Sequence, residues 1–237
     1  MQKPIVLITG ASQGLGAELA RLYAHRAAAL VLVARTPEPL LVLQTELAPH
    51  LEVLAFPGSV DDDEHVHRVV AAAEAHFGRI DILINNASTL GGSPMPWLEK
   101  LGPTAFGTLM DVNVRAPLHI AQHILPGMRA RREGKIVNIT SDAAVQAYAG
   151  WGGYGASKAA LEHLSRVLAE ELAGSGIGVA VIDPGNMNTQ MHRDAEPGED
   201  LSSLPRARSV APAVLELINA APAGYARYEA QALVAAV

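Results

Sequence analysis

The sequence alternates short apolar runs with longer Ala- and Leu-rich segments. Six runs of about five residues are nearly continuous in apolar, often β-branched side chains: residues 5–9, 30–34, 51–55, 80–84, 135–140 and 178–182. Such runs are typical of strands that are buried on both faces of a parallel sheet. Between them lie segments with helical spacing, such as residues 14–27 and 64–77. This order predicts right-handed crossovers and an α/β fold, a doubly wound parallel sheet with helices on both faces.

The length of the chain, 237 residues, suits a single α/β domain. We find no internal repeat and no linker between two cores, so residues 1–237 are predicted to form one domain. Residues 186–209 are polar and rich in turn formers. Because long irregular loops often cover binding sites, this segment is predicted to be a lid. Hydrophobic residues make up 49% and charged residues 18%, which excludes a disordered chain.

Charge and residue usage exclude several classes of function. The chain has 18 basic and 24 acidic residues, which argues against nucleic acid or an anionic membrane as a partner. It has no cysteine, so disulfides, zinc–thiolate sites and thiol catalysis are excluded. The first apolar run, residues 5–8, is too short for a membrane span or a signal peptide. A cytoplasmic protein is therefore expected.

A glycine-rich turn follows the first predicted strand. It has the spacing G-x-x-x-G-x-G, from Gly10 through Gly14 to Gly16. Glycines let the chain turn tightly and let backbone N–H groups approach a pyrophosphate at the positive end of a helix. No Gly-Lys-Ser/Thr follows, which excludes a P-loop. The glycine-rich turn alone leaves two alternatives to a dinucleotide-binding site. It could be an ordinary connection between a strand and a helix, or it could belong to a methyltransferase.

The second predicted strand ends in Ala34-Arg35-Thr36. An enzyme selective for NAD usually has a carboxylate here for the ribose hydroxyls, whereas a nearby Arg suits a 2′-phosphate. The planar fork of Arg35 pairs well with phosphate oxygens. NADP(H) is therefore predicted in preference to NAD(H), with a solvated surface Arg as the alternative.

Tyr154 and Lys158 are four residues apart at the start of an Ala-rich segment with helical spacing. This spacing puts both side chains on one helix face, where an ammonium can lower the pKa of a phenol toward a useful range. Ser141 follows the fifth predicted strand, and ligands of open α/β sheets bind at that edge.

Together these motifs resemble the short-chain dehydrogenase/reductase superfamily. The matching segments are Thr9 to Gly16, Asn85-Asn86-Ala87, Asn113 within Asp111-Val112-Asn113-Val114, Ser141, Tyr154, Lys158, and Pro184-Gly185 with Thr189. They span residues 9–189 in the order and at the spacings of that family.

The resemblance implies a Rossmann-type fold and reduction of a ketone or aldehyde to an alcohol by hydride transfer from NADPH. It implies that Tyr154 gives a proton to the substrate, Lys158 lowers the pKa of Tyr154 and holds the nicotinamide ribose, and Ser141 orients the carbonyl. Asn113 would position a proton-relay water. The expected cofactor-binding residues are Gly10, Ser12, Gln13, Gly14, Leu15, Gly16, Arg35, Thr36, Ser59, Val60, Asn86, Ala87, Tyr154, Lys158, Pro184, Gly185, Met187 and Thr189.

By this resemblance, residues 1–110 mainly bind the cofactor and residues 111–185 carry the catalytic set. It also implies a homodimer or homotetramer that packs helices near residues 104–131 and 154–173. The sequence departs from the family at three positions. Ser59 stands where an Asp often contacts adenine, Ser88 replaces the usual Gly after Asn85-Asn86-Ala87, and Gln13 replaces a basic residue of many NADP-type members.

Other residues are interpreted as structural or as candidates for the substrate pocket. His119 and His123 are four apart, but no third ligand is evident and no metal site is predicted. The acidic run 61–64 is interpreted as a capped helix start, and Asp183 as structural. Candidates for the substrate pocket are Gln146, Trp151, Met187, Met191 and His192. A non-catalytic dinucleotide-binding regulator is the alternative function, which the complete set of catalytic residues disfavours.

Overall fold

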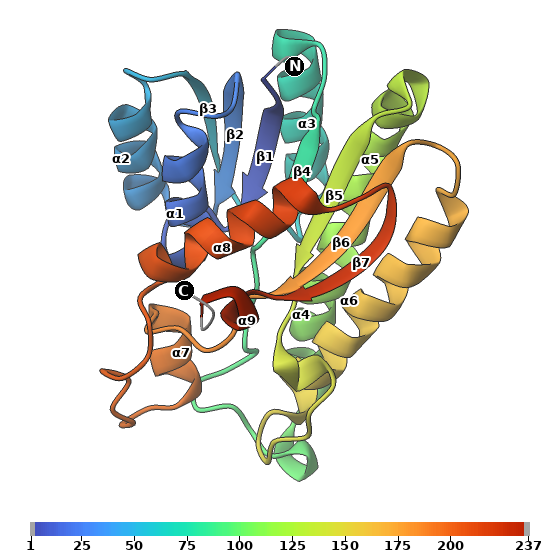
Figure 1. Ribbon diagram of the computed structural model, residues 1–237. Coiled ribbons are helices and arrows are strands. Elements are labelled where there is room, and N and C mark those ends of the chain that lie inside the picture. The colour runs from blue at the N-terminus through green and yellow to red at the C-terminus, as the bar shows by residue number, and fades with distance from the viewer. Residues whose placement is uncertain (1–2, 235–237) are drawn as a thin grey trace.

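The computed structural model describes residues 3–234. Its centre is a parallel seven-stranded sheet in the order β3-β2-β1-β4-β5-β6-β7 (Figure 1). The strands are β1 Ile5–Thr9, β2 Ala29–Ala34, β3 Glu52–Pro57, β4 Ile82–Asn85, β5 Gly134–Ile139, β6 Ile177–Asp183 and β7 Gly224–Glu229. The order reverses between β1 and β4, which is the switch point at which ligands of such sheets bind.

Helices connect the strands. They are α1 Gly14–Tyr23, α2 Pro37–Leu47, α3 Asp63–Phe77, α4 Pro103–Met110, α5 Ala116–Arg131, α6 Gly152–Glu171, α7 Gln190–Ala195, α8 Ala207–Ala220 and α9 Ala230–Val234. Two 3₁₀ turns, η1 Leu98–Lys100 and η3 Asp142–Ala144, and a π-helical turn, η2 Asp111–Arg115, complete the chain. None of the helices in residues 3–234 combines the length and apolar character that a membrane crossing demands.

The strands are apolar on both faces because helices cover both faces of the sheet. On β1, Val6 and Ile8 belong to the core under α1, α2 and α8, whereas Leu7 belongs to the core under α3 and α5. Each of these three side chains is at most 1% exposed. The result is a single Rossmann-like domain, which confirms the doubly wound fold predicted from the sequence.

Some strand ends differ by one or two residues from the predicted bounds, such as β3, which is Glu52–Pro57 where residues 51–55 were expected. Three other differences concern two helix boundaries and one strand. The helix predicted over residues 14–27 ends at Tyr23. The helix predicted from residue 64 begins at Asp63, where the Asp62 carboxylate accepts hydrogen bonds from the amides of Glu64 and His65. Strand β7 was not predicted, because this partly exposed edge strand mixes Gly, Arg and Glu with its apolar side chains and has no continuous apolar run.

The segment 186–209 contains more regular structure than the irregular loop that the sequence predicts. It includes the short helix α7, and Asn188 forms an isolated parallel bridge with Arg206. Its last residues begin α8. The Thr189 hydroxyl caps α7 by accepting a hydrogen bond from the amide of His192 at 3.3 Å. A threonine cap of this kind gives a short polar segment a defined start.

Candidate active site

The predicted site residues meet at one edge of the sheet. The glycine turn follows β1, Arg35 follows β2, Ser59 follows β3, Asn86 follows β4, and Ser141 follows β5. Pro184, Gly185, Met187 and Thr189 follow β6, and Tyr154 and Lys158 come from the first turns of α6. Because all strands are parallel, their carboxyl ends share this edge, and topology alone brings together residues that are far apart in sequence.

The glycine turn is held by the loop after β4. Gly10 has a φ of +66°, and a Cβ on Gly16 would overlap the Gly10 carbonyl oxygen. The Asn86 Nδ2 donates to the carbonyls of Thr9 and Gly10 at 3.0 and 3.1 Å. The Thr9 Oγ1 accepts from the amides of Asn86 and Ala87, each at 3.0 Å. The side chain of Asn86 therefore shapes the turn, which the sequence had not indicated.

The start of α1 offers free backbone donors at this turn. Its N-cap residue, Gln13, makes no capping bond with its side chain, so the first amides of the helix keep their hydrogens available. Such amides, with the positive end of the helix, suit an anion. Leu15 and Gly16 are buried in the same turn, and Ser12 and Gly14 are half-buried.

The other predicted cofactor residues lie on either side of the turn. Arg35 and Thr36 are exposed after β2. After β3, the Ser59 hydroxyl bonds to Asp61, and Val60 is buried. After β6, Met187 packs against the core under α1, α2 and α8. A Cβ on Gly14 would lie 3.8 Å from the Thr189 methyl group, so the β6 loop reaches the glycine turn.

Tyr154 and Lys158 are buried on one face of α6, at 8% and 2% exposure. The Lys158 Nζ lies 5.6 Å from the centre of the Tyr154 ring and donates to the Ile139 carbonyl at 2.9 Å. The Ser141 hydroxyl, after β5, donates to the Asp142 carboxylate at 3.0 Å. Tyr154 and Lys158 therefore lie on the same face of α6, as their four-residue spacing predicts.

Burial dominates the ionisation of this pair. It raises the pKa of the Tyr154 phenol well above its ordinary value, although the hydroxyls of Ser88 and Ser141 act in the opposite direction. The sequence predicts a pKa lowered by Lys158, and in this structure the net direction is upward because the phenolate would lose its hydration. Burial also lowers the pKa of Lys158 to about 8, and Asp183 opposes this shift. At neutral pH Tyr154 is a protonated phenol beside a cationic lysine.

Asn113 lies in the π-helical turn η2, a type of irregularity that is frequent at functional sites. Its Nδ2 donates to the Thr89 carbonyl and to the Ser157 hydroxyl, each at 2.9 Å. Its Oδ1 accepts from the Thr89 amide at 2.8 Å and from the Ser88 hydroxyl at 3.0 Å. These four bonds use both donors and both lone pairs of the amide side chain. The Asn113 side chain therefore joins the loop after β4 to α6.

Sequence comparison agrees with this geometry. The profile of the short chain dehydrogenase family matches residues 4–200. The chain belongs to the short-chain dehydrogenase family. Its members are oxidoreductases that bind a nicotinamide dinucleotide and act on small molecules. The glycine turn with its free amides and the polar groups around Tyr154 fit such a cofactor.

Two curated relatives of this short-chain dehydrogenase have named activities. An NADPH-dependent pterin aldehyde reductase of Arabidopsis thaliana is 34% identical over 78% of this chain and 76% of its own length. The 3-oxoacyl-[acyl-carrier-protein] reductase of rhamnolipid biosynthesis in Pseudomonas aeruginosa is 34% identical over 80% of this chain and 75% of its own.

Solved structures of the family superimpose closely. A short chain dehydrogenase from Salmonella enterica has a TM-score of 0.87 and 30% identity, covering 97% of this chain and 96% of its own. One from Shigella flexneri, in complex with NADP, has a TM-score of 0.86 and 28% identity over 98% of both chains.

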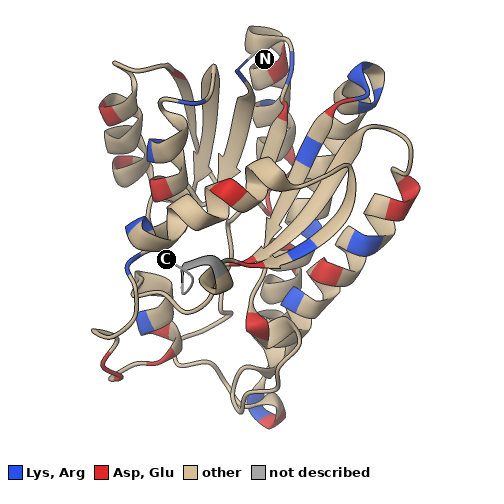
Figure 2. Ribbon diagram, viewed as in Figure 1, with Lys and Arg blue, Asp and Glu red and all other residues tan. Residues whose placement is uncertain are grey.

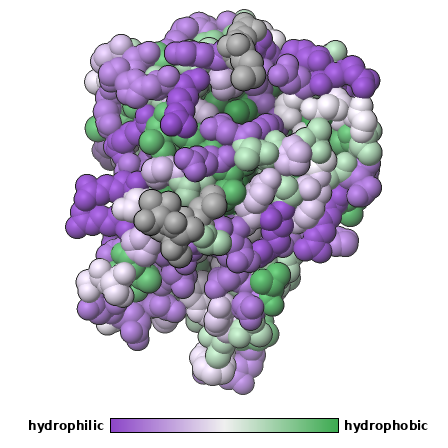
Figure 3. All heavy atoms as spheres, viewed as in Figure 1, coloured by the Kyte–Doolittle hydropathy of each residue, from purple (hydrophilic) through white to green (hydrophobic). Residues whose placement is uncertain are grey.

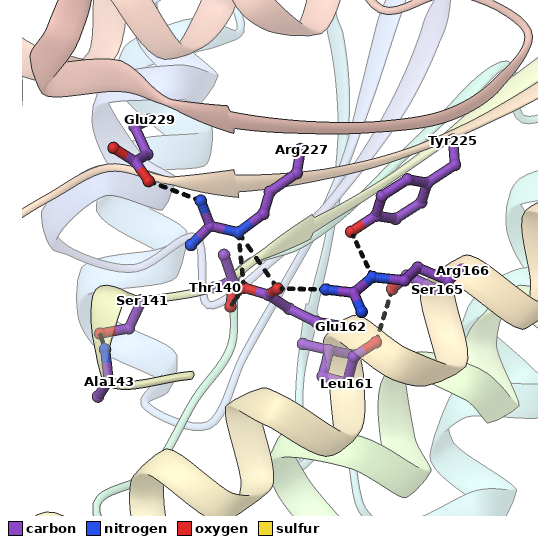
Figure 4. A network of polar contacts seen from close by, with 10 residues as sticks. All are labelled: Thr140, Ser141, Ala143, Leu161, Glu162, Ser165, Arg166, Tyr225, Arg227 and Glu229. Carbon is purple, nitrogen blue, oxygen red and sulfur yellow. Dashed lines mark hydrogen bonds and ion pairs between the residues drawn. The ribbon is translucent and has the colours of Figure 1, made fainter. Parts of the chain in front are cut away.

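A buried carboxylate that the sequence analysis missed supports the segments that carry Ser141 and Tyr154 in this dehydrogenase (Figure 4). Glu162 lies two turns after Tyr154 and is 2% exposed. It accepts from the Thr140 hydroxyl at 2.9 Å and from the Arg227 Nε at 3.2 and 3.3 Å. Arg166 lies 3.4 Å away. Glu162 thus ties α6 both to β7 and to the residue before Ser141. Basic and acidic positions alternate along α6 (Figure 2). This alternation was the one pattern in the sequence that could have indicated an ion-pair role for Glu162.

The surroundings of Tyr154 are otherwise apolar. Tyr154 forms a separate cluster with Leu90, Leu109, Ala143 and Ala195, against which Met95, Leu101, Trp151 and Met191 pack. The Trp151 ring lies 5.8 Å from that of Tyr154 and 6.5 Å from that of His192. Of the predicted pocket residues, Trp151, Met191 and His192 are therefore brought together near Tyr154. Gln146 is exposed, and Met187 packs elsewhere.

The paired histidines lie on α5, where the His119 Nδ1 is 3.2 Å from the Asp63 carboxylate at the start of α3. The Nε2 atoms of His119 and His123 are 3.1 Å apart on α5. Within residues 3–234, no group of three or more His, Asp or Glu side chains is arranged to hold a metal ion. Asp183 accepts a hydrogen bond from the Gly185 amide at 2.8 Å, and so shapes the loop after β6.

Proposed function

We propose that this chain is an NADPH-dependent carbonyl reductase that converts a ketone or aldehyde to an alcohol. The observation that carries the proposal is the buried phenol of Tyr154, with the Lys158 Nζ 5.6 Å from its ring centre, at the sheet edge where Ser141 follows β5. A neutral phenol next to a fixed positive charge is suited to release a proton to a substrate oxygen that gains negative charge.

In this proposal NADPH supplies the hydride, and the protein supplies the proton and the alignment. The Ser141 hydroxyl donates to the carbonyl oxygen and orients it, and Tyr154 passes its proton to that oxygen. Lys158 stabilises the resulting phenolate by its charge. Because the side chain of Asn113 has no free donor or acceptor, a relay water held by this residue would bind its main-chain carbonyl.

The proposed cofactor contacts follow the edge of the sheet. The glycine turn and the first amides of α1 would hold the pyrophosphate, and Asn86 would keep that turn in shape. Ser59 and Val60 would lie along the adenine, and Pro184, Gly185 and Thr189 along the nicotinamide. Exposed Arg35, which follows a strand that ends without a carboxylate, supports preference for the 2′-phosphate of NADP. The NADPH-dependent relative and the NADP-bound neighbour support the same preference.

The apolar cluster around Tyr154 supports an uncharged, apolar or aromatic carbonyl substrate. Met95, Trp151 and Met191 present thioether and indole surfaces near the phenol, and such groups favour apolar and aromatic ligands. Apolar side chains are also exposed on neighbouring segments, among them Trp97, Leu98, Val145 and Tyr148. Figure 3 shows apolar surface at the lower end of the molecule, where the loops after β4 and β5 lie. Residues 186–209 would act as a lid over the substrate. The protein would be a homodimer or homotetramer in the cytoplasm.

The first test measures NADPH consumption with a panel of diketones, quinones, aromatic aldehydes and carboxylated ketones. We expect turnover of uncharged apolar members and weak turnover of carboxylated ones. An absence of turnover across the panel, with NADPH bound, would favour the non-catalytic regulator.

The second test measures cofactor preference in Arg35→Ala. Loss of a charge-assisted phosphate contact should lower kcat/KM for NADPH by about 10- to 100-fold and leave kcat/KM for NADH nearly unchanged. Arg26→Ala removes another exposed arginine, beyond the opposite end of α1, and should leave both values unchanged. An unaltered preference for NADPH in Arg35→Ala would refute the role of Arg35.

A further inference from the structure

The hydroxyl of Ser141 is bound to a carboxylate to which the sequence analysis gave no role. Its Oγ donates to the Asp142 Oδ1 at 3.0 Å and accepts from the Ala143 amide at 3.2 Å. The other carboxylate oxygen of Asp142, Oδ2, accepts from the Tyr148 hydroxyl at 2.7 Å. The two carboxylate oxygens therefore have separate partners, and one of them lies beside the hydroxyl that is expected to bind a substrate carbonyl.

The backbone around Asp142 is fixed next to the catalytic helix. The Asp142 carbonyl accepts from the Gln146 amide at 2.7 Å, which closes a turn after η3. A Cβ on Gly155 would lie 2.6 Å from the Ala143 carbonyl oxygen, so this turn packs against the first turn of α6. Ala143 also belongs to the apolar cluster that contains Tyr154. Asp142 is thus held at a defined place beside the proposed reaction centre.

The carboxylate of Asp142 keeps its charge in this position. It is half-buried, and within residues 3–234 its side-chain hydrogen bonds come from two hydroxyls, which do not neutralise it. Glu162, by contrast, lies 3.2 Å from an arginine nitrogen. A partly buried carboxylate that is held by hydroxyls is a strong acceptor for a further O–H or N–H group.

Binding of a carbonyl at Ser141 would change the bonds of this pair. The Ser141 hydroxyl has one hydrogen, and in this structure that hydrogen is donated to Asp142. When the hydrogen turns to a substrate carbonyl, the Asp142 Oδ1 loses its donor. Because an acceptor without a donor is costly away from water, a substrate that brings its own donor is favoured.

The spacing of the two groups determines where that donor lies on the substrate. The Ser141 Oγ and the Asp142 Oδ1 are 3.0 Å apart. In an α-hydroxy ketone whose hydroxyl is syn to the carbonyl, ordinary bond lengths place the two oxygens about 3 Å apart as well. The carbonyl oxygen can therefore accept from Ser141 while the adjacent hydroxyl donates to Asp142.

We propose that Asp142 is a specificity-determining residue that selects ketones and aldehydes with a hydroxyl or N–H group next to the carbonyl. This inference rests on the proposed reductase function and names the substrate class of the same site. The Asp142 Oδ1 accepts a hydrogen bond from the substrate donor, and Tyr148 holds the other oxygen in place. The negative charge repels a substrate carboxylate at the same position.

The test compares three aromatic ketones of similar size: α-hydroxyacetophenone, α-methoxyacetophenone and benzoylformate. The methoxy compound keeps the oxygen and lacks the hydrogen, and benzoylformate carries a carboxylate. In the wild-type protein, kcat/KM for the hydroxy compound should exceed that for the methoxy compound by about 10- to 100-fold, because a hydrogen bond to an ionised acceptor is gained. Benzoylformate should be the poorest substrate.

Three variants separate the charge from the position of the acceptor. Asp142→Asn keeps the size of the side chain and an acceptor for Ser141, and should lower the hydroxy-to-methoxy ratio by about tenfold and improve turnover of benzoylformate relative to the methoxy compound. Tyr148→Phe keeps the charge but releases one carboxylate oxygen, so it should lower the hydroxy-to-methoxy ratio and retain the discrimination against benzoylformate. Glu170→Gln removes an exposed acid at the far end of α6 and should leave every ratio unchanged. Because each ratio is compared with that of the wild type, the intrinsic reactivities of the ketones cancel.

A hydroxy-to-methoxy ratio near one in the wild type, or a ratio that Asp142→Asn leaves unchanged, would overturn the proposal while the reductase function stands. Equilibrium dialysis of the same ketones with NADP-loaded protein is the second readout, and the Kd ratios should follow the same pattern even in a variant without turnover. A wild-type protein that reduces none of the ketones would refute the proposed reductase function. The Kd ratios would then still show whether Asp142 selects a carbonyl compound that carries a donor.

Discussion

Replacement of Glu162 by Gln tests the buried charge network that joins α6 to β7. Glutamine keeps the size of the side chain and an acceptor for Thr140, so the substitution removes mainly the charge. The carboxylate lies 3.2–3.4 Å from the nitrogens of Arg227 and Arg166. At an effective dielectric constant near 20, each such pair has a gross attraction of about 5 kcal/mol.

The net effect is smaller, because the cost of removing the Glu162 carboxylate from water offsets much of this attraction. Breaking a buried pair costs about 3–5 kcal/mol. Arg227 is 22% exposed, and Arg166 is 51% exposed. Both can regain some water when the carboxylate is lost, so we expect the lower end, about 3 kcal/mol. For a domain of this size, that corresponds to a fall in Tm of roughly 6–12 °C.

The assay is urea unfolding followed by circular dichroism at one fixed protein concentration. Glu170→Gln, an exposed acid on the same helix, should stay within about 0.5 kcal/mol of wild type. The double variant Glu162→Leu/Arg227→Met should be more stable than either single variant, because no uncompensated charge remains between these two positions. A Glu162→Gln variant as stable as Glu170→Gln would refute the reasoning.

Two further predictions concern packing and pH. Gly58→Ala should cost about 1–3 kcal/mol in urea unfolding, since a Cβ there would overlap the buried His65 ring. Gly102→Ala has open space and should be nearly neutral, and equal stability of the two variants would contradict this account. Lys158, with a pKa of about 8, is charged below that pH and neutral above it, so kcat/KM for NADPH should fall above pH 8. A flat profile up to pH 10 would show that the charge of Lys158 is not required.

The fold was predictable because its signals are local. Residues 5–9 and 30–34 are nearly continuous apolar runs of strand length, as expected of strands covered on both faces. Strand β7 could not be predicted because it has no continuous apolar run, and charged Arg227 lies beside Tyr225 on the face directed to α6 (Figure 4). Its pairing with β6 is a long-range contact that no local sequence pattern predicts.

The candidate site was predictable in its residues and less so in its contacts. Spacing alone placed Tyr154 and Lys158 on one face, because helix geometry fixes that relation. Spacing could not show that the Asn113 side chain forms hydrogen bonds with Thr89, Ser88 and Ser157. Nor could it show that burial sets the direction of the Tyr154 pKa, since burial depends on residues from separate loops, such as Leu90 and Ala195.

The most direct test of the central claim is a single-turnover measurement of deuterium transfer from 4-deuterated NADPH to the best ketone of the panel. In the wild-type protein, the product alcohol should carry deuterium on its carbinol carbon. Tyr154→Phe should bind NADPH with an unchanged Kd and transfer deuterium about 100- to 10,000-fold more slowly, because the proton donor is gone. Transfer by Tyr154→Phe within tenfold of the wild-type rate would contradict the account.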